Sequence, residues 1–375
     1  TNPNVVWVPQ VNLVRTIDAG KSWQAVKIPG HGDHHDVWID PANPRRVITG
    51  NDGGVSLTLD GGATWAAPAI PTPQFYNIDV DDRLPYHVGG TIQDWGTASG
   101  PAYTLRSGED GGGGPNLGDF YIVGGGEAGD FVYDPAEPGH IYAGEYSGYI
   151  SHYPEGTGNF RNISIYPRNF SGWPAKESHY RFQWTAPIAV SPHDPHVLYH
   201  GANVLLRTID RGVHWEAISP DLTRNDKSKQ QWTGGPITGD ITTVEYYDTI
   251  FSVAESPVTA GEIWVGTDDG LVQLTLDAGK SWKNVTPPKL PEWSTIEAIE
   301  LSHRDAGTAY VVADGHRLDD NRPYLYRTRD HGRSWELLGQ GLPADQHLYV
   351  VREDPTDPML LYVGAERGLY YSRDG

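Results

Sequence analysis

The sequence predicts an all-β protein made of repeated four-stranded antiparallel sheets, and three observations support that prediction. An eight-residue phrase of the form Thr/Ser-x-Asp-x-Gly-x-x-Trp recurs along the 375 residues. Short apolar runs rich in β-branched and aromatic residues are separated by Gly, Pro and Asp, which is typical of strands joined by tight turns. Finally, the apolar residues follow no helical period.

The repeated phrase has five complete copies, TIDAGKSW, TLDGGATW, TIDRGVHW, TLDAGKSW and TRDHGRSW, which begin at Thr16, Thr58, Thr208, Thr275 and Thr328. A partial copy, SRDG, occupies residues 372–375. We expect the Asp side chain to bond N–H groups across a tight turn and the Gly to adopt a positive φ. We expect the Trp to open the next strand and to pack its ring back over the hairpin.

The spacing of the phrase indicates the kind of repeat. Its aspartates recur at intervals of roughly 40 to 70 residues, with one longer gap that holds three units. A period of about 40 to 50 residues with four short strands per unit is typical of a β-propeller. We expect seven blades over residues 31–375, the last one incomplete, and a partial blade over residues 1–30 from the end of a preceding propeller. Eight blades in one ring is the alternative.

The other strands can be placed from the same register. First strands end in acidic or Ser-Pro turns, at Val37–Pro44, Phe131–Pro138, Ile188–Pro195 and Val350–Pro358. Second strands are apolar and end in Gly, at Val47–Gly50, Ile141–Gly144, Val197–Gly201, Ile263–Gly266 and Leu361–Gly364. The repeated turns then share one face, and the loops after second strands and before first strands share the opposite face.

Composition limits the partners. Lys and Arg number 28 against 48 Asp and Glu, a net charge of −20. Nucleic acid and anionic membrane surfaces both require a basic face, so we expect neither as a ligand. No membrane-spanning run is present. The chain has no cysteine, which excludes disulfides and thiolate chemistry and fits a secreted or periplasmic protein.

Acidic residues gather in the loops predicted for the face opposite the repeated turns, which we call the acidic face. They are Asp52, Asp94, Glu127, Glu145, Asp240, Asp268, Asp269 and Glu366. Clustered carboxylates raise one another's pKa or recruit cations, as catalytic and ligand-binding sites require. The alternative is that Asp and Gly are simply good turn formers.

The segment HGDHHD is a candidate divalent-cation site on the same face. Imidazole and carboxylate groups together suit zinc or manganese, and the segment offers His31, Asp33, His34, His35 and Asp36. Strand alternation would send His34 and Asp36 to one side and His35 to the other, so the five cannot all bind one ion. A hydrogen-bonded structural loop is the alternative.

An aromatic segment, Phe170–Pro187, adds candidate ligand-binding residues. Tyr180 and Trp184 can stack on a sugar or grip a peptide, and Arg181 can pair with a ligand carboxylate. The alternative is that the run Arg181–Trp184 forms an inner strand with buried aromatics.

The repeated phrase resembles the Asp-box (BNR) repeat of sialidases, sortilin-type receptors and xyloglucan-cleaving endoglucanases. Longer segments, among them HGDHHDVWIDP, GNDGG, YRFQWTAP, SPDLTRND, VEYYDTIF and GTDDGLV, resemble large secreted bacterial proteins with two sortilin- or glycosidase-like propellers. The resemblance covers essentially the whole chain. It implies a further propeller domain in the full-length protein.

In the xyloglucanase-type enzymes, two aspartates on different propellers act as acid and base. Asp52 is the residue that matches their Asp-Gly-Gly motif here, and Asp268 is a candidate partner, with Asp94, Glu127, Asp240 or a missing propeller as alternatives. A sialidase would need an arginine triad, and no matching Arg motif is present. We therefore expect a binding or scaffold module for a protein, peptide or glycan, and the alternative is a glycoside hydrolase acting on a β-glucan.

Overall fold

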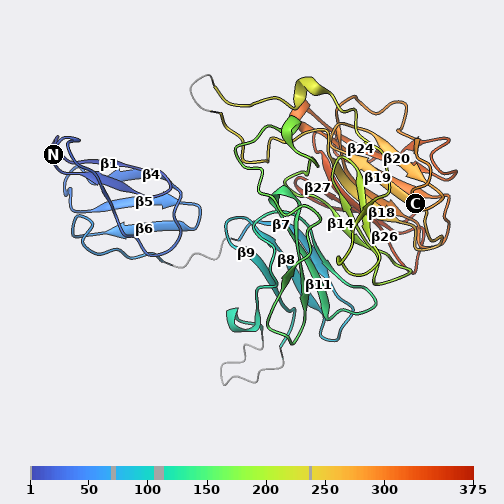
Figure 1. Ribbon diagram of the computed structural model, residues 1–375, viewed down its shortest axis with the longest axis horizontal. Helices are drawn as coiled ribbons and strands as arrows, with labels where there is room; N and C mark the ends of the chain where they lie inside the picture. Colours follow the sequence, from blue (N-terminus) through green and yellow to red (C-terminus); the bar gives the residue numbers. More distant parts are fainter. Residues whose placement is uncertain (1, 69–72, 105–113, 236–238) are drawn as a thin grey trace. The chain divides into compact units, whose positions relative to one another are not determined.

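The computed structural model describes residues 2–68, 73–104, 114–235 and 239–375. Most of the glycine-rich run 108–115, which the sequence predicts to be an insertion, lies outside these residues. The chain forms two compact units, Thr1–Gln74 and Phe75–Gly375, which are described separately. In Figure 1 each sheet occupies a narrow range of colour, since each is built from one contiguous stretch of sequence.

The described residues of the first unit form two three-stranded sheets. Their strands are β1 (Val6–Val8), β2 (Val14–Thr16) and β3 (Gln24–Ala25), then β4 (His34–Ile39), β5 (Val47–Asn51) and β6 (Gly54–Thr58).

The second unit contains a three-stranded sheet, four four-stranded sheets and a final three-stranded sheet among its described residues. The first three sheets comprise β7 (Phe75–Val80), β8 (His87–Ile92), β9 (Gly96–Pro101); β10 (Phe131–Tyr133), β11 (His140–Glu145), β12 (Tyr149–Pro154), β13 (Arg161–Asn162); and β14 (Ile188–Val190), β15 (Leu198–Gly201), β16 (Leu205–Thr208), β17 (Glu216–Ala217). The last three comprise β18 (Ile250–Glu255), β19 (Ile263–Thr267), β20 (Val272–Thr275), β21 (Lys283–Asn284); β22 (Thr295–Leu301), β23 (Ala309–Gly315), β24 (Asp320–Thr328), β25 (Glu336–Leu337); and β26 (Leu348–Glu353), β27 (Leu361–Ala365), β28 (Gly368–Ser372).

Helical structure in the described part of the chain is limited to single 3₁₀ turns. These are η1 (Leu117–Asp119), η2 (Tyr146–Gly148), η3 (Ala175–Glu177), η4 (Lys227–Lys229) and η5 (His316–Leu318). None of the described helices has the length and apolar character needed to cross a bilayer.

Every sheet is an antiparallel meander in sequence order, so the predicted all-β class and the predicted second strands are confirmed. Isolated bridges pair Leu57 of β6 with Ala66 and Ser99 of β9 with Tyr121, so Ala66 and Tyr121 occupy the position of a fourth strand in these two sheets. The described residues thus form eight separate sheets, two in the first unit and six in the second. The number of blades and the predicted division at residue 30 stay predictions.

The repeated phrase folds as the same turn at each copy. In the copy that begins at Thr275, the Thr275 hydroxyl donates to Asp277 Oδ1 at 2.8 Å and accepts from Gly279 N at 2.9 Å. Asp277 also accepts from Ser281 N at 2.8 Å and from its hydroxyl at 2.6 Å. Gly279 has a φ of +93°, as the sequence predicts. These bonds span at most four residues, so the phrase itself specifies the turn.

The tryptophans of the repeated phrase in the second unit form a contact between sheets that the sequence does not predict. Trp282 Nε1 donates to the carbonyl of Ile218, directly after β17, at 3.0 Å. Trp215 and Trp335 make the equivalent bonds, to Ile163 and Val285, after β13 and β21. Each ring therefore ties its own sheet to the outermost strand of the preceding sheet, rather than only covering its own hairpin.

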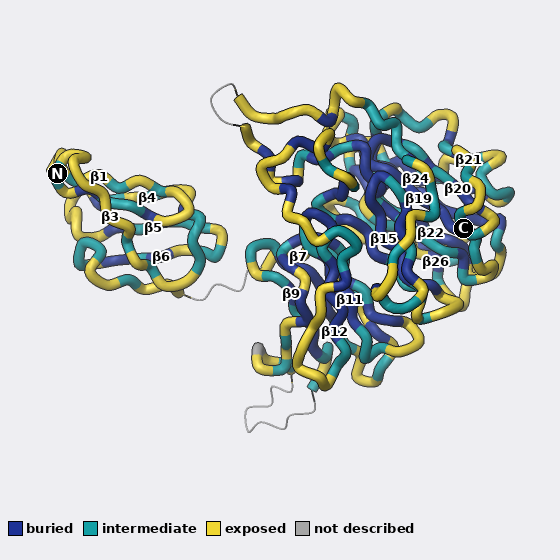
Figure 2. Tube along the Cα trace, in the orientation of Figure 1, coloured by how far each residue is buried: buried dark blue, intermediate teal, exposed yellow. Residues whose placement is uncertain are grey.

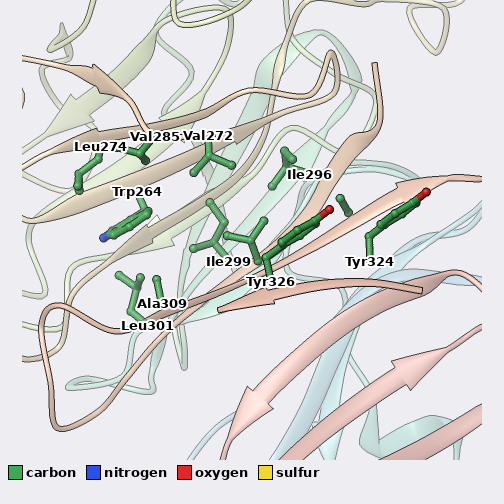
Figure 3. Packing of buried hydrophobic residues seen from close by; sticks show 12 residues of the cluster. Trp264, Val272, Leu274, Val285, Ile296, Ile299, Leu301, Ala309, Tyr324 and Tyr326 are labelled. Carbon is green, nitrogen blue, oxygen red and sulfur yellow. The ribbon is translucent and has the colours of Figure 1, made fainter. Parts of the chain in front are cut away.

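The core of the second unit lies between neighbouring sheets. Figure 3 shows one such cluster, in which Trp264 of β19 packs with Ile299 of β22 and Tyr326 of β24. Buried segments concentrate on the inner strands of the second unit, whereas the strands of the first unit are mostly half-buried or exposed (Figure 2). The stacked sheets thus form a rigid support for the loops at their ends.

Candidate functional site

Four of the residues proposed from the sequence converge in the second unit, where the turn after β8, the loop before β10, the end of β11 and the segment before β14 come together. They are Asp94, Glu127, Glu145 and Trp184. We call this cluster, with its neighbours, the Glu127–Glu145 site; its residues are Tyr76, Gln93, Asp94, Glu127, Glu145, Tyr146 and Trp184. All seven are half-buried.

Local backbone geometry places the two glutamates. Glu145 ends β11 and caps η2, and its carboxylate accepts from Tyr146 N at 2.9 Å. The same carboxylate lies on the backbone of Gly126, where a Cβ would stand 0.8 Å from Glu145 Oε2. Only glycine therefore leaves room for Glu145 in this position.

Glu127 is held from the neighbouring sheet. Its Oε2 accepts from Gln93 Nε2 at 2.9 Å and from the backbone N of Asp94 at 3.1 Å. Asp94 lies in the turn after β8 with a φ of +62°. Gln93 is oriented in turn by the hydroxyl of Tyr76. The cluster is thus a connected polar network with a defined geometry.

The electrostatics distinguish Glu145 from an ordinary surface carboxyl. Burial and then the charge of Glu127 raise its pKa to about 7, although N–H groups of Tyr146 and Glu127 act in the opposite direction. Glu145 is therefore partly protonated at neutral pH and can donate as well as accept a hydrogen bond.

Aromatic rings border the carboxyls. Tyr146 and Trp184 stack with ring centroids 5.2 Å apart and an angle of 8° between their planes. Trp95, the neighbour of Asp94, is 65% exposed. A site with aromatic faces beside carboxyl groups suits a ligand with one apolar and one hydroxyl-bearing surface.

The first unit brings together part of the predicted metal segment. Asp33, His35 and Asp52 each offer a ligand atom within 4.8 Å of the others. His35 Nε2 lies 2.5 Å from Asp52 Oδ1. A small bulge between His34 and Asp36 lets His35 face Asp52 across the sheet. The group has the donors of a divalent-cation site.

The other members of that segment have structural contacts instead. His34 is buried, its Nδ1 lies 3.0 Å from Thr49 Oγ1, and burial lowers its pKa. Asp36 accepts from the backbone N of Val37 at 2.8 Å. His31 Nδ1 lies 3.1 Å from the carbonyl of Gly32.

Asp268 and Asp269 are fully enclosed. Asp268 accepts from the hydroxyl of Thr249 at 2.6 Å, and Asp269 from the backbone N of Arg224 at 2.6 Å. Burial raises the pKa of both, that of Asp269 to about 7. Asp248, which the sequence interpretation missed, is buried beside Asp269 and contributes to that rise. These carboxyls are 0–2% exposed and do not reach the surface.

Arg181 and Tyr180 also lie within the fold. Arg181 is 6% exposed and donates to Asp221 Oδ2 at 2.8 Å. Tyr180 is half-buried and packs edge-on against Phe182. Phe182 is buried as the alternative predicts, but Arg181–Trp184 forms no strand and Trp184 is half-buried, so the predicted inner strand is wrong.

Asp240 and Glu366 are exposed and outside the Glu127–Glu145 site. The Asp240 backbone N donates to the carbonyl of Thr233, and Glu366 Oε2 lies 3.4 Å from Arg367 Nε.

A hollow of about 220 Å³ lies at the C-terminal ends of β7 and β10, whereas the Glu127–Glu145 site lies toward their N-terminal ends. The hollow is lined by Asp79, Asp81, Tyr133 and Asp134 among others. No residue of the Glu127–Glu145 site lines this hollow.

Sequence reasoning missed three members of the site: Tyr76, Gln93 and Tyr146. Gln93 and Tyr146 stand directly beside Asp94 and Glu145, so the loops were recognised but the side chains that orient the carboxyls were not. Tyr76 lies in a first strand, where an aromatic residue carries no separate signal.

The fold and the site together define an all-β protein of repeated antiparallel sheets with a carboxylate–aromatic site at the strand ends. No family model matches the sequence. Over 104 residues the chain is 31% identical to an oligoxyloglucan-reducing end-specific xyloglucanase of Emericella nidulans, a match that covers 26% of this chain and 12% of the enzyme.

Similar solved structures include the β-propeller domain of Cps50 (Swd1) from Myceliophteria thermophila, with 12% identity, a TM-score of 0.49, and 91% and 97% of the two chains covered. YCF48 from Cyanidioschyzon merolae has 14% identity and a TM-score of 0.47, covering 93% of this chain and 98% of that one. An ancestral GH74 enzyme has 14% identity and a TM-score of 0.42, covering 99% of this chain and 43% of the enzyme. These similarities concern the backbone alone.

Proposed function

We propose that the chain is a glycan-binding module whose ligand is a neutral β-glucan chain, held at the Glu127–Glu145 site. The observation that supports this proposal is the stack of Tyr146 on Trp184 beside the carboxyls of Glu127 and Glu145. A sugar ring presents a C–H face to an aromatic ring and hydroxyl groups around its edge, and carboxyl groups bind those hydroxyls.

Charge favours a neutral ligand. The chain carries a net charge of −20, and Asp94, Glu127 and Glu145 add local negative potential at the site. Anionic sugars and nucleic acids would be repelled there. The sequence similarity to a xyloglucanase, over 26% of this chain, supports a β-glucan as the first ligand class to test.

Calorimetry with cello-oligosaccharides and xyloglucan oligosaccharides tests the proposal. Tyr146→Ala and Glu127→Gln should each weaken binding by about tenfold or more, the equivalent of roughly 1.4 kcal/mol. Glu366→Gln, an exposed acidic residue outside the site, is the matched control and should leave affinity unchanged. Failure of the unmodified chain to bind any β-glucan at millimolar concentration would rule the proposal out.

A specific observation favours hydrolysis as a second candidate function. Burial and the charge of Glu127 raise the pKa of Glu145 to about 7, and glycoside hydrolysis uses a carboxylic acid of raised pKa together with a second carboxyl group. In this case Glu145 is the acid and Glu127 the base. Release of reducing ends from xyloglucan should then disappear in Glu145→Gln and Glu127→Gln while Asp52→Ala retains it. Binding without any released sugar supports the binding function alone.

A further inference from the structure

A group of metal-ligating side chains lies in the second unit, apart from the Glu127–Glu145 site, at the junction of two neighbouring sheets. Asp314 is near the end of β23, His316 begins η5, and His347 directly precedes β26. One ligand atom of each lies within 4.8 Å of the others. The three residues are separated by up to 33 positions in sequence, and only the packing of β26 beside β23 brings them together.

Two of the three side chains are enclosed. Asp314 and His347 are 4% and 6% exposed, whereas the side chain of His316 is 37% exposed. The group therefore has an interior pair of donors and one donor that borders solvent. An ion can enter on the side of His316.

His347 is the most informative member. Its Nε2 lies 3.0 Å from the hydroxyl of Tyr349, whereas its buried Nδ1 has no hydrogen-bond partner. A buried polar atom without a partner destabilises the fold unless something else binds it. The Nε2 contact with Tyr349 also leaves Nδ1 as the atom available to a metal, the usual arrangement for a metal-binding imidazole.

The other two donors are already arranged around the same point. Asp314 Oδ1 accepts from the backbone N of His316 at 2.8 Å, and Asp314 Oδ2 bonds the His316 ring. The rings of His316 and His347 stack with centroids 4.6 Å apart. Bonds of about 2.0–2.2 Å to a tetrahedral ion place donor atoms roughly 3.3 Å apart, which modest side-chain rotation achieves from this starting geometry.

Several ionisable groups lie near the three donors. Glu297, in β22, senses the charge of Asp314, and Tyr349 senses the charges of Asp314, Glu297 and Glu366. Arg317 is the opposing positive group near them. Burial raises the pKa of Glu297 to about 8, and Glu366 pairs with Arg367, so the negative charge at the donor atoms is that of Asp314 itself.

We propose that Asp314, His316 and His347 form a binding site for a first-row divalent transition-metal ion, with zinc as the reference ion, that links the sheet of β22–β25 to the sheet of β26–β28. Two imidazole donors and one carboxylate suit zinc or iron(II), and they disfavour calcium and magnesium, which prefer oxygen ligands. Water completes the coordination shell on the exposed side of His316.

The test uses zinc alone and the full chain carrying His35→Ala, which removes the Asp33–His35–Asp52 group of the first unit as a competing site. Calorimetry should then show one zinc ion per chain. His347→Gln should weaken zinc binding by more than about 100-fold, because it removes a direct ligand, whereas loss of an outer partner already costs 10- to 100-fold. His303→Ala, which replaces a more exposed histidine of the same unit, is the matched control.

Because His347 is buried, circular dichroism must confirm that His347→Gln is folded. His316→Ala, at a half-exposed position, gives an independent reading and should also abolish tight binding. Cobalt(II) in place of zinc should give visible absorption bands that both variants lose. Absence of 1:1 zinc binding in the His35→Ala chain, or zinc binding that survives both His316→Ala and His347→Gln, overturns the proposal.

Discussion

The carboxyl group of Glu145 occupies the space that a side chain at Gly126 would fill, since a Cβ there would stand 0.8 Å from Glu145 Oε2. Gly126 lies in the loop before β10 and Glu145 at the end of β11, and β10 and β11 pair in one sheet. The relationship makes the Glu127–Glu145 site sensitive to a single methyl group.

Gly126→Ala should therefore displace Glu145 and weaken glucan binding by at least about tenfold. The relevant measurement is calorimetry beside a thermal melt, because the displaced carboxyl also costs stability. Gly50→Ala is the control, since a Cβ at Gly50 has no neighbouring atom within 4 Å. Equal binding by Gly126→Ala and the unmodified chain would show that the position of Glu145 is irrelevant to the ligand.

The pKa of Glu145 predicts a specific pH dependence. Burial and the charge of Glu127 raise it from the ordinary 4.5 to about 7. The unfolded chain therefore releases this proton near pH 4.5 and the folded chain only near pH 7, so stability falls as the pH rises through that interval. Glu145→Gln should remove this part of the fall, as measured by urea unfolding between pH 4 and 8. Parallel curves for the two proteins contradict the assignment.

The tryptophan bond between sheets can be tested by Trp282→Phe. The phenyl ring keeps most of the packing but cannot donate to the Ile218 carbonyl, so a loss of about 1–3 kcal/mol in the free energy of unfolding is expected. Trp23→Phe is the control, because Trp23 occupies the same position of the repeated phrase and is 47% exposed. Its expected effect is within about 0.5 kcal/mol. Equal losses of stability in the two variants would mean that the indole stabilises the repeated turn itself and not the contact between sheets.

Arg181 distinguishes a structural role from a ligand-binding one. It is buried and paired with Asp221 at 2.8 Å, so Arg181→Ala should cost about 3–5 kcal/mol of stability by leaving a partly buried carboxylate unpaired. Arg207→Ala breaks a more exposed pair with Glu216 and should cost less than about 1 kcal/mol. Both are measured by chemical unfolding. A stable Arg181→Ala chain that has lost ligand binding would instead restore the role first expected from the sequence.

The repeated turn has the opposite pH signature to Glu145. Hydrogen bonds from the hydroxyl and N–H of Ser281 lower the pKa of Asp277 from 3.8 to about 2. The stability that these bonds supply is present above about pH 3.8 and is lost as the pH falls toward 2. Asp277→Asn should thus be less stable than the unmodified chain at pH 6, and the difference should shrink by pH 2. A constant difference over this range would contradict the assignment.

The accuracy of the sequence interpretation follows the distance over which each contact acts. The repeated turn was predicted correctly because its bonds join residues such as Thr275, Asp277 and Gly279, which are at most four positions apart. The positions of first and second strands followed from the same short-range signals. The loops that carry Asp94, Glu127 and Glu145 could be assigned to a shared region because successive meander sheets place equivalent loops at equivalent ends.

What the sequence by itself determined is the local conformation: all-β structure, the repeated turn, and the strand ends at which acidic loops emerge. Only the tertiary structure decided which acidic side chains are accessible, enclosing Asp268 while leaving Glu145 half-buried beside Trp184. It also decided that Trp282 bonds the preceding sheet and that His347 meets Asp314. The physical reason is that burial and convergence depend on how separate sheets stack, and contacts between residues tens of positions apart leave no periodic pattern in the chain.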